Sequence, residues 1–156
     1  MPTVAGMATS TTQASLQGGS WVQTGPLTFN HALAASGTFQ QISEVPALTI
    51  PYAGVWWVSY NAYTGMNVRA GGALGVRTAL FNNGVQIPGS EAMSNLATAA
   101  DLGIQTTAAH TLLHTFAAKD VVTLQATAYG NGEAAFIASD DNARTSVMAH
   151  WVSPGF

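Results

Sequence analysis

The feature that most constrains this chain is the run at residues 51–63, which reads PYAGVWWVSYNAY. A turn at Pro51 and Gly54 opens into β-branched and aromatic residues, which pack well on a pleated surface, so the run predicts a strand. Alternate residues of a strand point to opposite faces. One face therefore carries Trp56, Val58, Tyr60 and Ala62, and the other carries Val55, Trp57, Ser59, Asn61 and Tyr63. Because both faces hold large apolar side chains, we expect both to be shielded from water. One face would pack against the domain's own core, and the other would pack against another subunit.

The rest of the chain predicts further short strands separated by turns. The pair Asn83-Gly84 is the strongest hairpin signal, because a type I′ turn needs positive φ at both central residues. Residues 65–72, with their three glycines, predict a loop. Residues 91–103 fit a helical turn, but Gly103 and the surrounding β pattern favour a loop or a short strand. The other expected strands are 21–24, 27–30, 38–43, 47–50, 74–81, 85–87, 104–116, 121–129, 134–138 and 145–152. Many short strands without a helix indicate an all-β sandwich, jelly roll or barrel.

The chain is poor in charge. Only 7% of its 156 residues are charged, against roughly 25% in an average soluble protein. Such a composition is typical of a protein whose surface is largely hidden in an assembly. The net charge of −3 and the four basic residues argue against binding to nucleic acid or to an anionic membrane. No segment approaches the ~18 apolar residues of a membrane span, and the absence of cysteine excludes disulfides and thiolate chemistry.

The first residues differ from the rest. Residues 1–19 consist mostly of Thr, Ser, Ala, Gly and Gln and carry no charge. Val4, Met7 and Leu16 are their sizeable apolar residues, too few for a core. The segment also lacks the basic and apolar regions of a signal peptide. We therefore expect an assembly arm at 1–19 that lies along another protein, and one folded domain at 20–156.

Three segments, taken together, carry a resemblance to a known family. Residues 50–60 hold a proline, then a glycine, then an aromatic strand; residues 110–124 hold a leucine-containing strand, an acidic turn and a second strand; residues 136–148 hold an Asp/Asn loop before the last strand. In order and spacing they resemble the globular head of complement component 1, q subcomponent, and its tumour necrosis factor-like relatives. The sequence departs from that family at Lys119, where glycine is usual, and at Ser146, Met148 and Ala149 in the last strand.

The resemblance implies a ten-stranded jelly roll that forms a compact homotrimer and works by binding, with no enzymatic activity and no cofactor. Together with the strand at 51–63, which has large apolar residues on both faces, the resemblance implies that one face of a sheet forms the interface between subunits. The candidates for that trimer interface are Trp57, Tyr63, Ala109, Thr111, Leu113, Ser146 and Met148.

Other candidate sites have competing explanations. Asp140 and Asp141 could hold calcium, as some relatives do in this region, or form a solvated turn. His110 and His114 would lie roughly 13 Å apart on a strand, too far for one metal ion unless a threefold axis brings copies together. The aromatic residues could form a sugar platform, although strand positions favour packing. The sequence contains no Gly-x-Ser-x-Gly nucleophile elbow of a hydrolase, no His-Glu-x-x-His motif of a metalloprotease and no phosphate-binding loop motif.

Two functions fit these observations best. The first is a non-enzymatic virion structural protein, a trimeric decoration protein on a bacteriophage head, whose partners are its own copies and the major capsid protein or another virion protein. The second is a trimeric receptor- or glycan-binding module of a phage tail tip or a bacterial surface adhesin. The second function predicts an exposed pocket with aromatic and acidic residues.

Overall fold

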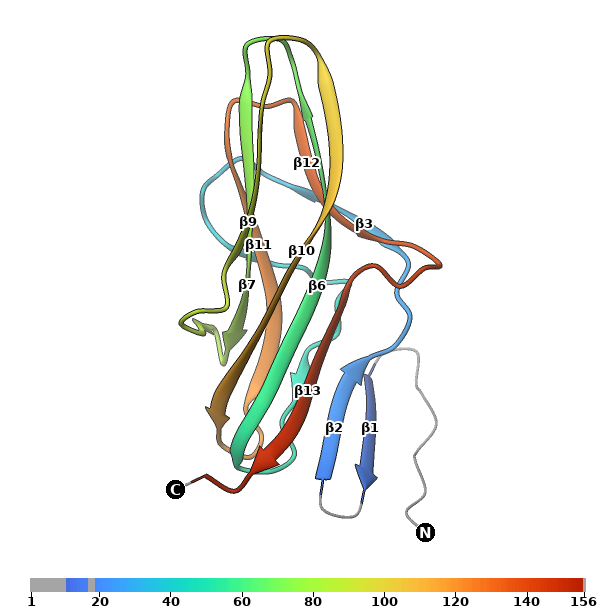
Figure 1. Cartoon of the computed structure of the whole chain (residues 1–156), viewed down its shortest axis with the longest axis vertical. Helices are drawn as coiled ribbons and strands as arrows, with labels where there is room; N and C mark the ends of the chain where they lie inside the picture. Colours follow the sequence, from blue (N-terminus) through green and yellow to red (C-terminus); the bar gives the residue numbers. More distant parts are fainter. Residues whose placement is uncertain (1–10, 17–18, 156) are drawn as a thin grey trace.

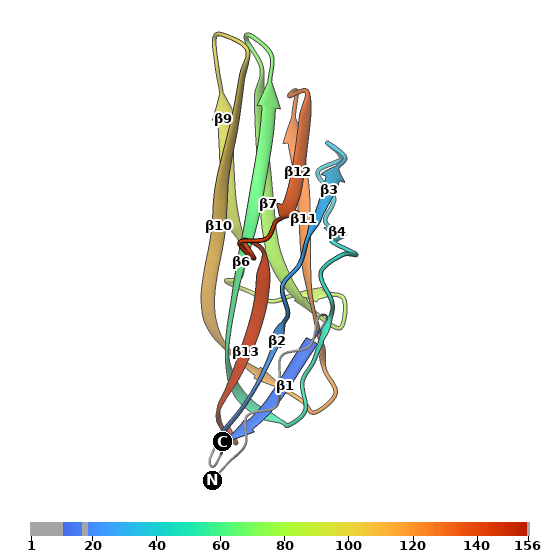
Figure 2. The same cartoon turned by 90° about the vertical axis from the view of Figure 1, so that its right-hand side faces the viewer.

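A computed structural model describes residues 11–16 and 19–155, and these residues form antiparallel strands without a helix. None of the described residues therefore belongs to a helix long and apolar enough to cross a membrane. The strands make two sheets that pack face to face (Figure 1). Figure 2 shows β10, β6 and β13 in one layer and β7 and β11 in the other.

The first sheet, sheet A, is organised around β6 (Gly54–Val68). Along one edge β6 pairs with β10 (Leu102–Phe116) over its whole length. Along the other edge it pairs first with β13 (Ser146–Ser153) and then with β12 (Ala134–Ser139). The sheet is completed by β2 (Gly19–Thr24) beside β13, β1 (Thr11–Leu16) beside β2, and β3 (Phe29–Leu33) beside β12.

The second sheet, sheet B, is organised around the pair β7 (Ala73–Asn82) and β11 (Val121–Gly130). The outer edge of β7 pairs with β8 (Val85–Gln86) and β9 (Ala92–Ala97). The outer edge of β11 pairs with β4 (Gln40–Gln41) and β5 (Leu48–Thr49).

The core lies between the sheets and follows the alternation expected for β6. Trp56, Val58, Tyr60 and Ala62 are all buried, each 2% exposed or less. The Tyr60 hydroxyl reaches across to the other sheet's side of the core, where it lies 2.8 Å from the Ser90 carbonyl oxygen and 3.0 Å from that of Thr78. Burial raises the pKa of this hydroxyl, so it stays a neutral hydrogen-bond donor. The inward face of β6 is therefore the centre of the domain.

Two turns have residues with positive φ, and for one of them the sequence predicts this backbone. Asn83 has φ of 49° and Gly84 has φ of 82°, so the positive φ expected for a type I′ turn is present at both positions, between β7 and β8. Lys119, in the turn between β10 and β11, has φ of 74°. A left-handed backbone there explains why the resembling family uses glycine at this position.

The structure also differs from the sequence-based expectations. The described residues form thirteen strands, where about ten were expected. The two that no expected strand covers are β1, within the expected arm, and β9, whereas β4, β5 and β8 shorten three expected strands to two residues each. The loop expected at 65–72 is wrong in its first half, since β6 continues to Val68. The uncertain segment 91–103 contains the strand β9. β1 pairs with β2 of the same chain, and the expected boundary after residue 19 falls inside β2, directly after its first residue.

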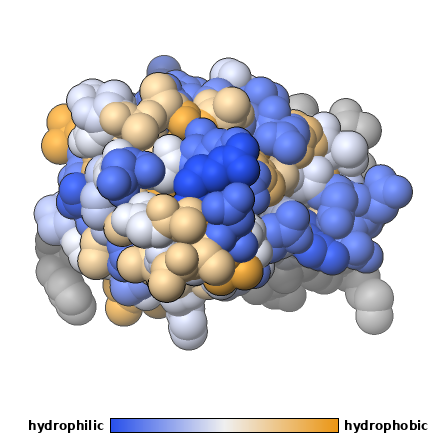
Figure 3. Space-filling model, turned by 90° about the horizontal axis from the view of Figure 1, so that it is seen from above, coloured by the Kyte–Doolittle hydropathy of each residue, from blue (hydrophilic) through white to orange (hydrophobic). Residues whose placement is uncertain are grey.

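The domain is elongated, and the β6–β7 and β9–β10 hairpins reach the same end of it (Figure 1). Figure 3 looks onto this end and shows strongly hydrophilic atoms near the centre of the view. An ion-pair network lies on these hairpins. The Arg69 guanidinium donates to Asp101 Oδ2 over 3.1 Å and to Glu133 Oε1 over 2.7 Å, which ties the β6–β7, β9–β10 and β11–β12 connections together.

Candidate functional site

The face of sheet A that points away from sheet B exposes several large apolar side chains. We call it the outer face. The strand register aligns its side chains in rows across four strands. One row runs from Leu113 on β10 through Trp57 on β6 and His150 on β13 to Trp21 on β2. The next row contains Thr111, Ser59, Met148 and Gln23.

The half of the outer face near the start of β6 is apolar and exposed. Trp57 is 54% exposed, Leu113 is 62% exposed and Met148 is 39% exposed. A shallow hollow of about 280 Å³ lies over Trp57, Thr111 and Leu113. We call this half the apolar half. Large apolar side chains in contact with water are costly, so a surface of this kind is a candidate interaction site.

The apolar half also carries no formal charge. The outward positions of β6, β10, β13 and β2 in this region are occupied by aliphatic, aromatic, hydroxyl, amide and imidazole side chains, with no Lys, Arg, Asp or Glu. Depletion of charge at the centre is what distinguishes a protein–protein interface from the rest of a surface. In addition, β10 pairs only with β6 among the described strands, which leaves a second edge of fifteen residues without a strand partner.

The structure brings the interface candidates together. They come from three strands that are far apart in the sequence, and their positions all lie on the outer face. These residues are Trp57, Tyr63, Ala109, Thr111, Leu113, Ser146 and Met148.

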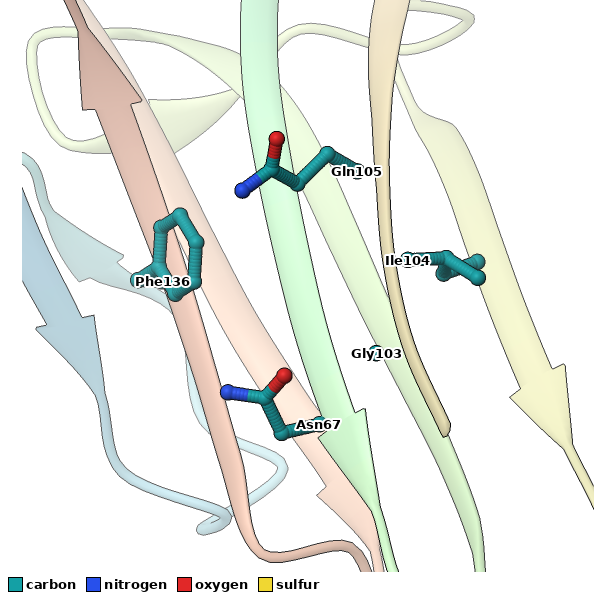
Figure 4. A pocket seen from close by; sticks show the side chains of 5 residues that line it. All are labelled: Asn67, Gly103, Ile104, Gln105 and Phe136. Atoms are coloured by element: carbon teal, nitrogen blue, oxygen red, sulfur yellow. The ribbon is translucent and has the colours of Figure 1, made fainter. Parts of the chain in front are cut away.

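The other half of the outer face, toward the end of β6, has a different character. There a hollow of about 360 Å³ is lined by Asn67, Gly103, Ile104, Gln105 and Phe136 (Figure 4). The register explains its construction. Gly65 has Gln105 on one side and Phe136 on the other, and the next outward position of β6 is Asn67, beside Gly103.

Missing side chains create this hollow. A Cβ atom on Gly65 would overlap the Phe136 ring, and a Cβ atom on Gly103 would overlap the Asn67 amide. The ring therefore lies over the bare backbone of Gly65, and two amide side chains approach the same space from neighbouring strands (Figure 4). The Tyr63 hydroxyl donates to Gln105 Oε1, which leaves the Gln105 NH₂ group available.

The rim of the hollow is charged. A second hollow of about 260 Å³ shares Asn67 and Gly103 with the first and is bordered by Asp101 and Glu133. Asp101 accepts a hydrogen bond from the Ala70 N–H at 2.9 Å. This bond has the largest lowering effect on the pKa of the Asp101 carboxyl, and the hydrogen bond from Arg69 lowers it further. With Arg69 paired to both acids, the rim holds one more negative than positive charge.

The remaining acids do not form a catalytic pair in the described residues. Glu44 pairs with His31 at 2.6 Å, and Glu91 pairs with Arg77 at 2.7 Å, whereas Glu133 pairs with Arg69 at the hairpin tips. Glu44, Glu91 and Glu133 thus lie in three different pairs, and Glu133 shares its partner, Arg69, with Asp101.

The metal candidates are also separate. Asp140 accepts the Asn142 N–H at 3.0 Å and pairs with Arg144 at 3.3 Å, while Asp141 is exposed. In the described part of the chain, no three His, Asp or Glu side chains gather as a metal site would require. His114 packs its ring edge-on at 4.5 Å from the Phe116 ring, and burial lowers its pKa.

The expected assembly arm is only partly described. Val4 and Met7 lie outside the described residues, and of Leu16 only the backbone is described, at the end of β1. Sequence reasoning did not identify the hollow at Asn67, Gln105 and Phe136. The available signal was a pair of glycines, Gly65 and Gly103, at outward positions of strands.

Comparison with known proteins supports the fold and no more. No family model matches the chain. No curated protein matches it either. Among solved structures, an Eiger TNF from S. frugiperda is similar, with a TM-score of 0.51, 8% sequence identity, and coverage of 84% of this chain and 96% of that chain. The chain has an all-β, antiparallel fold like that of TNF-like jelly rolls.

Proposed function

We propose that this chain is a non-enzymatic structural protein that assembles as a homotrimer through the apolar half of the outer face. The observation that carries the proposal is the exposure of Trp57 and Leu113, 54% and 62%, on the half of the outer face that has no formal charge. Burial of this face against a neighbouring copy would remove apolar surface from water and desolvate no ion. Threefold symmetry is supported by the resemblance to TNF-like proteins.

We propose further that the trimer decorates a bacteriophage head and binds the major capsid protein or another virion protein. The support is compositional: few charges, no cysteine and an uncharged, Thr- and Ser-rich arm at residues 1–19.

Sedimentation tests this role. In a density gradient of an infected-culture lysate, we expect the chain to travel with virus particles. A variant without residues 1–19 should remain a folded trimer with a near-normal melting temperature and should attach to the particles much more weakly. A variant without residues 1–10 serves for comparison, because it keeps β1 paired with β2.

Two results would count against the arm and the virion role. If the variant lacking residues 1–19 decorates particles normally, or fails to fold, the arm does not work as proposed. If the full chain is found on the surface of bacterial cells and not on particles, it acts as an adhesin, the second candidate. That candidate is favoured by the hollow beside Phe136, Asp101 and Glu133.

A further inference from the structure

The hollow on the outer face has no role in the proposed assembly. The large apolar side chains that would bury against a neighbour, Trp57, Leu113 and Met148, all lie in the apolar half. The hollow lies further along β6, at Gly65 and Asn67, where the side chains are amides and one aromatic ring. This difference along one strand indicates a second use for the same face.

The chemistry of the hollow is specific. Phe136 is partly exposed and lines the hollow (Figure 4), and the tip of its ring occupies the space that a Cβ atom on Gly65 would fill. An amide side chain can donate and accept hydrogen bonds at the same time, which suits a ligand with neighbouring hydroxyl groups. Asn67 has no side-chain hydrogen bond to another described residue, and Gln105 has one, through its oxygen, to Tyr63. Both NH₂ groups are therefore open to a ligand.

Gln105 is also held in place. Its partner Tyr63 lies beneath the Arg144 guanidinium, which is 4.8 Å from the centre of the Tyr63 ring. A contact of this kind restricts the ring, and the ring fixes the amide through the hydroxyl. A polar group that is positioned before binding loses less freedom when a ligand arrives.

We propose that this hollow binds a neutral hexopyranose unit of a glycan. The apolar C–H face of the sugar would pack on the Phe136 ring, and its hydroxyls would bond to the Asn67 and Gln105 amides. A volume of about 360 Å³ is at the low end of the range of roughly 300–1,000 Å³ for small-ligand sites, which suits one sugar ring. The excess negative charge of the Arg69, Asp101 and Glu133 rim disfavours acidic sugars.

This proposal goes beyond the structural role. It adds a ligand-binding activity on each protomer, and three equivalent sites on one trimer would strengthen attachment to a surface with many glycans. Binding of an isolated sugar should be weak, because a shallow, solvent-open site gains little from each contact.

Saturation-transfer NMR with the full-length protein tests the proposal. The probes are the methyl glycosides of glucose, galactose, mannose and N-acetylglucosamine, at millimolar concentration, with N-acetylneuraminic acid as the acidic comparison. We expect saturable transfer to at least one neutral glycoside. Phe136→Ala and Asn67→Ala should each weaken that binding at least tenfold. The matched control is Gln41→Ala, which removes an exposed amide from β4 in sheet B.

Three outcomes would overturn it. One is the absence of binding to any of the four neutral glycosides by both the native protein and a monomeric Trp57→Glu variant. Another is binding by the monomeric variant alone, which would mean that a neighbouring copy covers the hollow in the assembly. Equal binding by Asn67→Ala, Phe136→Ala and Gln41→Ala would likewise exclude this hollow as the site.

Discussion

Replacing Trp57 with glutamate should separate the protomers and leave each one folded. In the single chain Trp57 is 54% exposed and lies outside the hydrophobic core. Because a Trp side chain presents up to roughly 250 Å², about 135 Å² of it is left in contact with water. At about 25 cal/mol per Å², cover by a neighbouring copy stabilises each interface by about 3 kcal/mol.

A free-energy change of this size shifts the equilibrium between monomer and trimer strongly. About 3 kcal/mol corresponds to roughly a hundredfold change in an association constant, and a trimer loses it at each of three interfaces. Burying a glutamate adds a further penalty, since the outward positions of the apolar half hold no Lys or Arg to pair with it. The expected result is a monomer at micromolar concentration with a native circular dichroism spectrum.

Size-exclusion chromatography with light scattering measures this effect. The control is Val85→Glu, which places the same charge at a residue that is 71% exposed on β8, in the other sheet. The control should keep the native mass. If Trp57→Glu also keeps the native mass at micromolar concentration, the apolar half of the outer face is not the interface.

Two further predictions concern stability. Gly84→Val should lower the melting temperature by about 2–4 °C, because a β-branched residue at φ of 82° costs about 1 kcal/mol or more; an unchanged melting temperature would contradict the type I′ turn. Glu91→Gln should cost about 0.5–1 kcal/mol at pH 7, because the bond from Arg77 holds the pKa of Glu91 below its usual 4.5. That stabilisation is complete above pH 4.5 and disappears as the pH falls through the lower folded pKa, so the melting temperatures of the two proteins should converge in acid. A constant difference from pH 7 to strong acid would argue against an electrostatic origin.

The sequence predicts the centre of this fold well because local patterns decide it. Alternation separates Trp56 from Trp57 without any knowledge of the rest of the chain, and the structure buries the first and exposes the second. The Asn83-Gly84 turn is equally local, since few residues tolerate its backbone. The seven interface candidates share a face for the same reason, because residue spacing of two fixes the face of a strand.

Elements that depend on distant neighbours are not predictable in this way. β9 contains Ala, Ser and Asn, which have little preference for strands, and its conformation comes from pairing with β7. Gly65 looks like the start of a loop, yet it lies inside β6 because the Phe136 ring occupies the space of its missing side chain. The hollow follows from that tertiary contact, so Gly65 and Gly103 point to it only once their strands have been placed.

The molar mass of the native protein in solution tests the central claim most directly. One chain has a mass of 16.1 kDa. Light scattering of the full-length protein at micromolar concentration should give three times that value, about 48 kDa, with no dependence on dilution across the micromolar range. A mass of 16.1 kDa under the same conditions would contradict the account, because the exposed Trp57 and Leu113 would then have no neighbour to cover them.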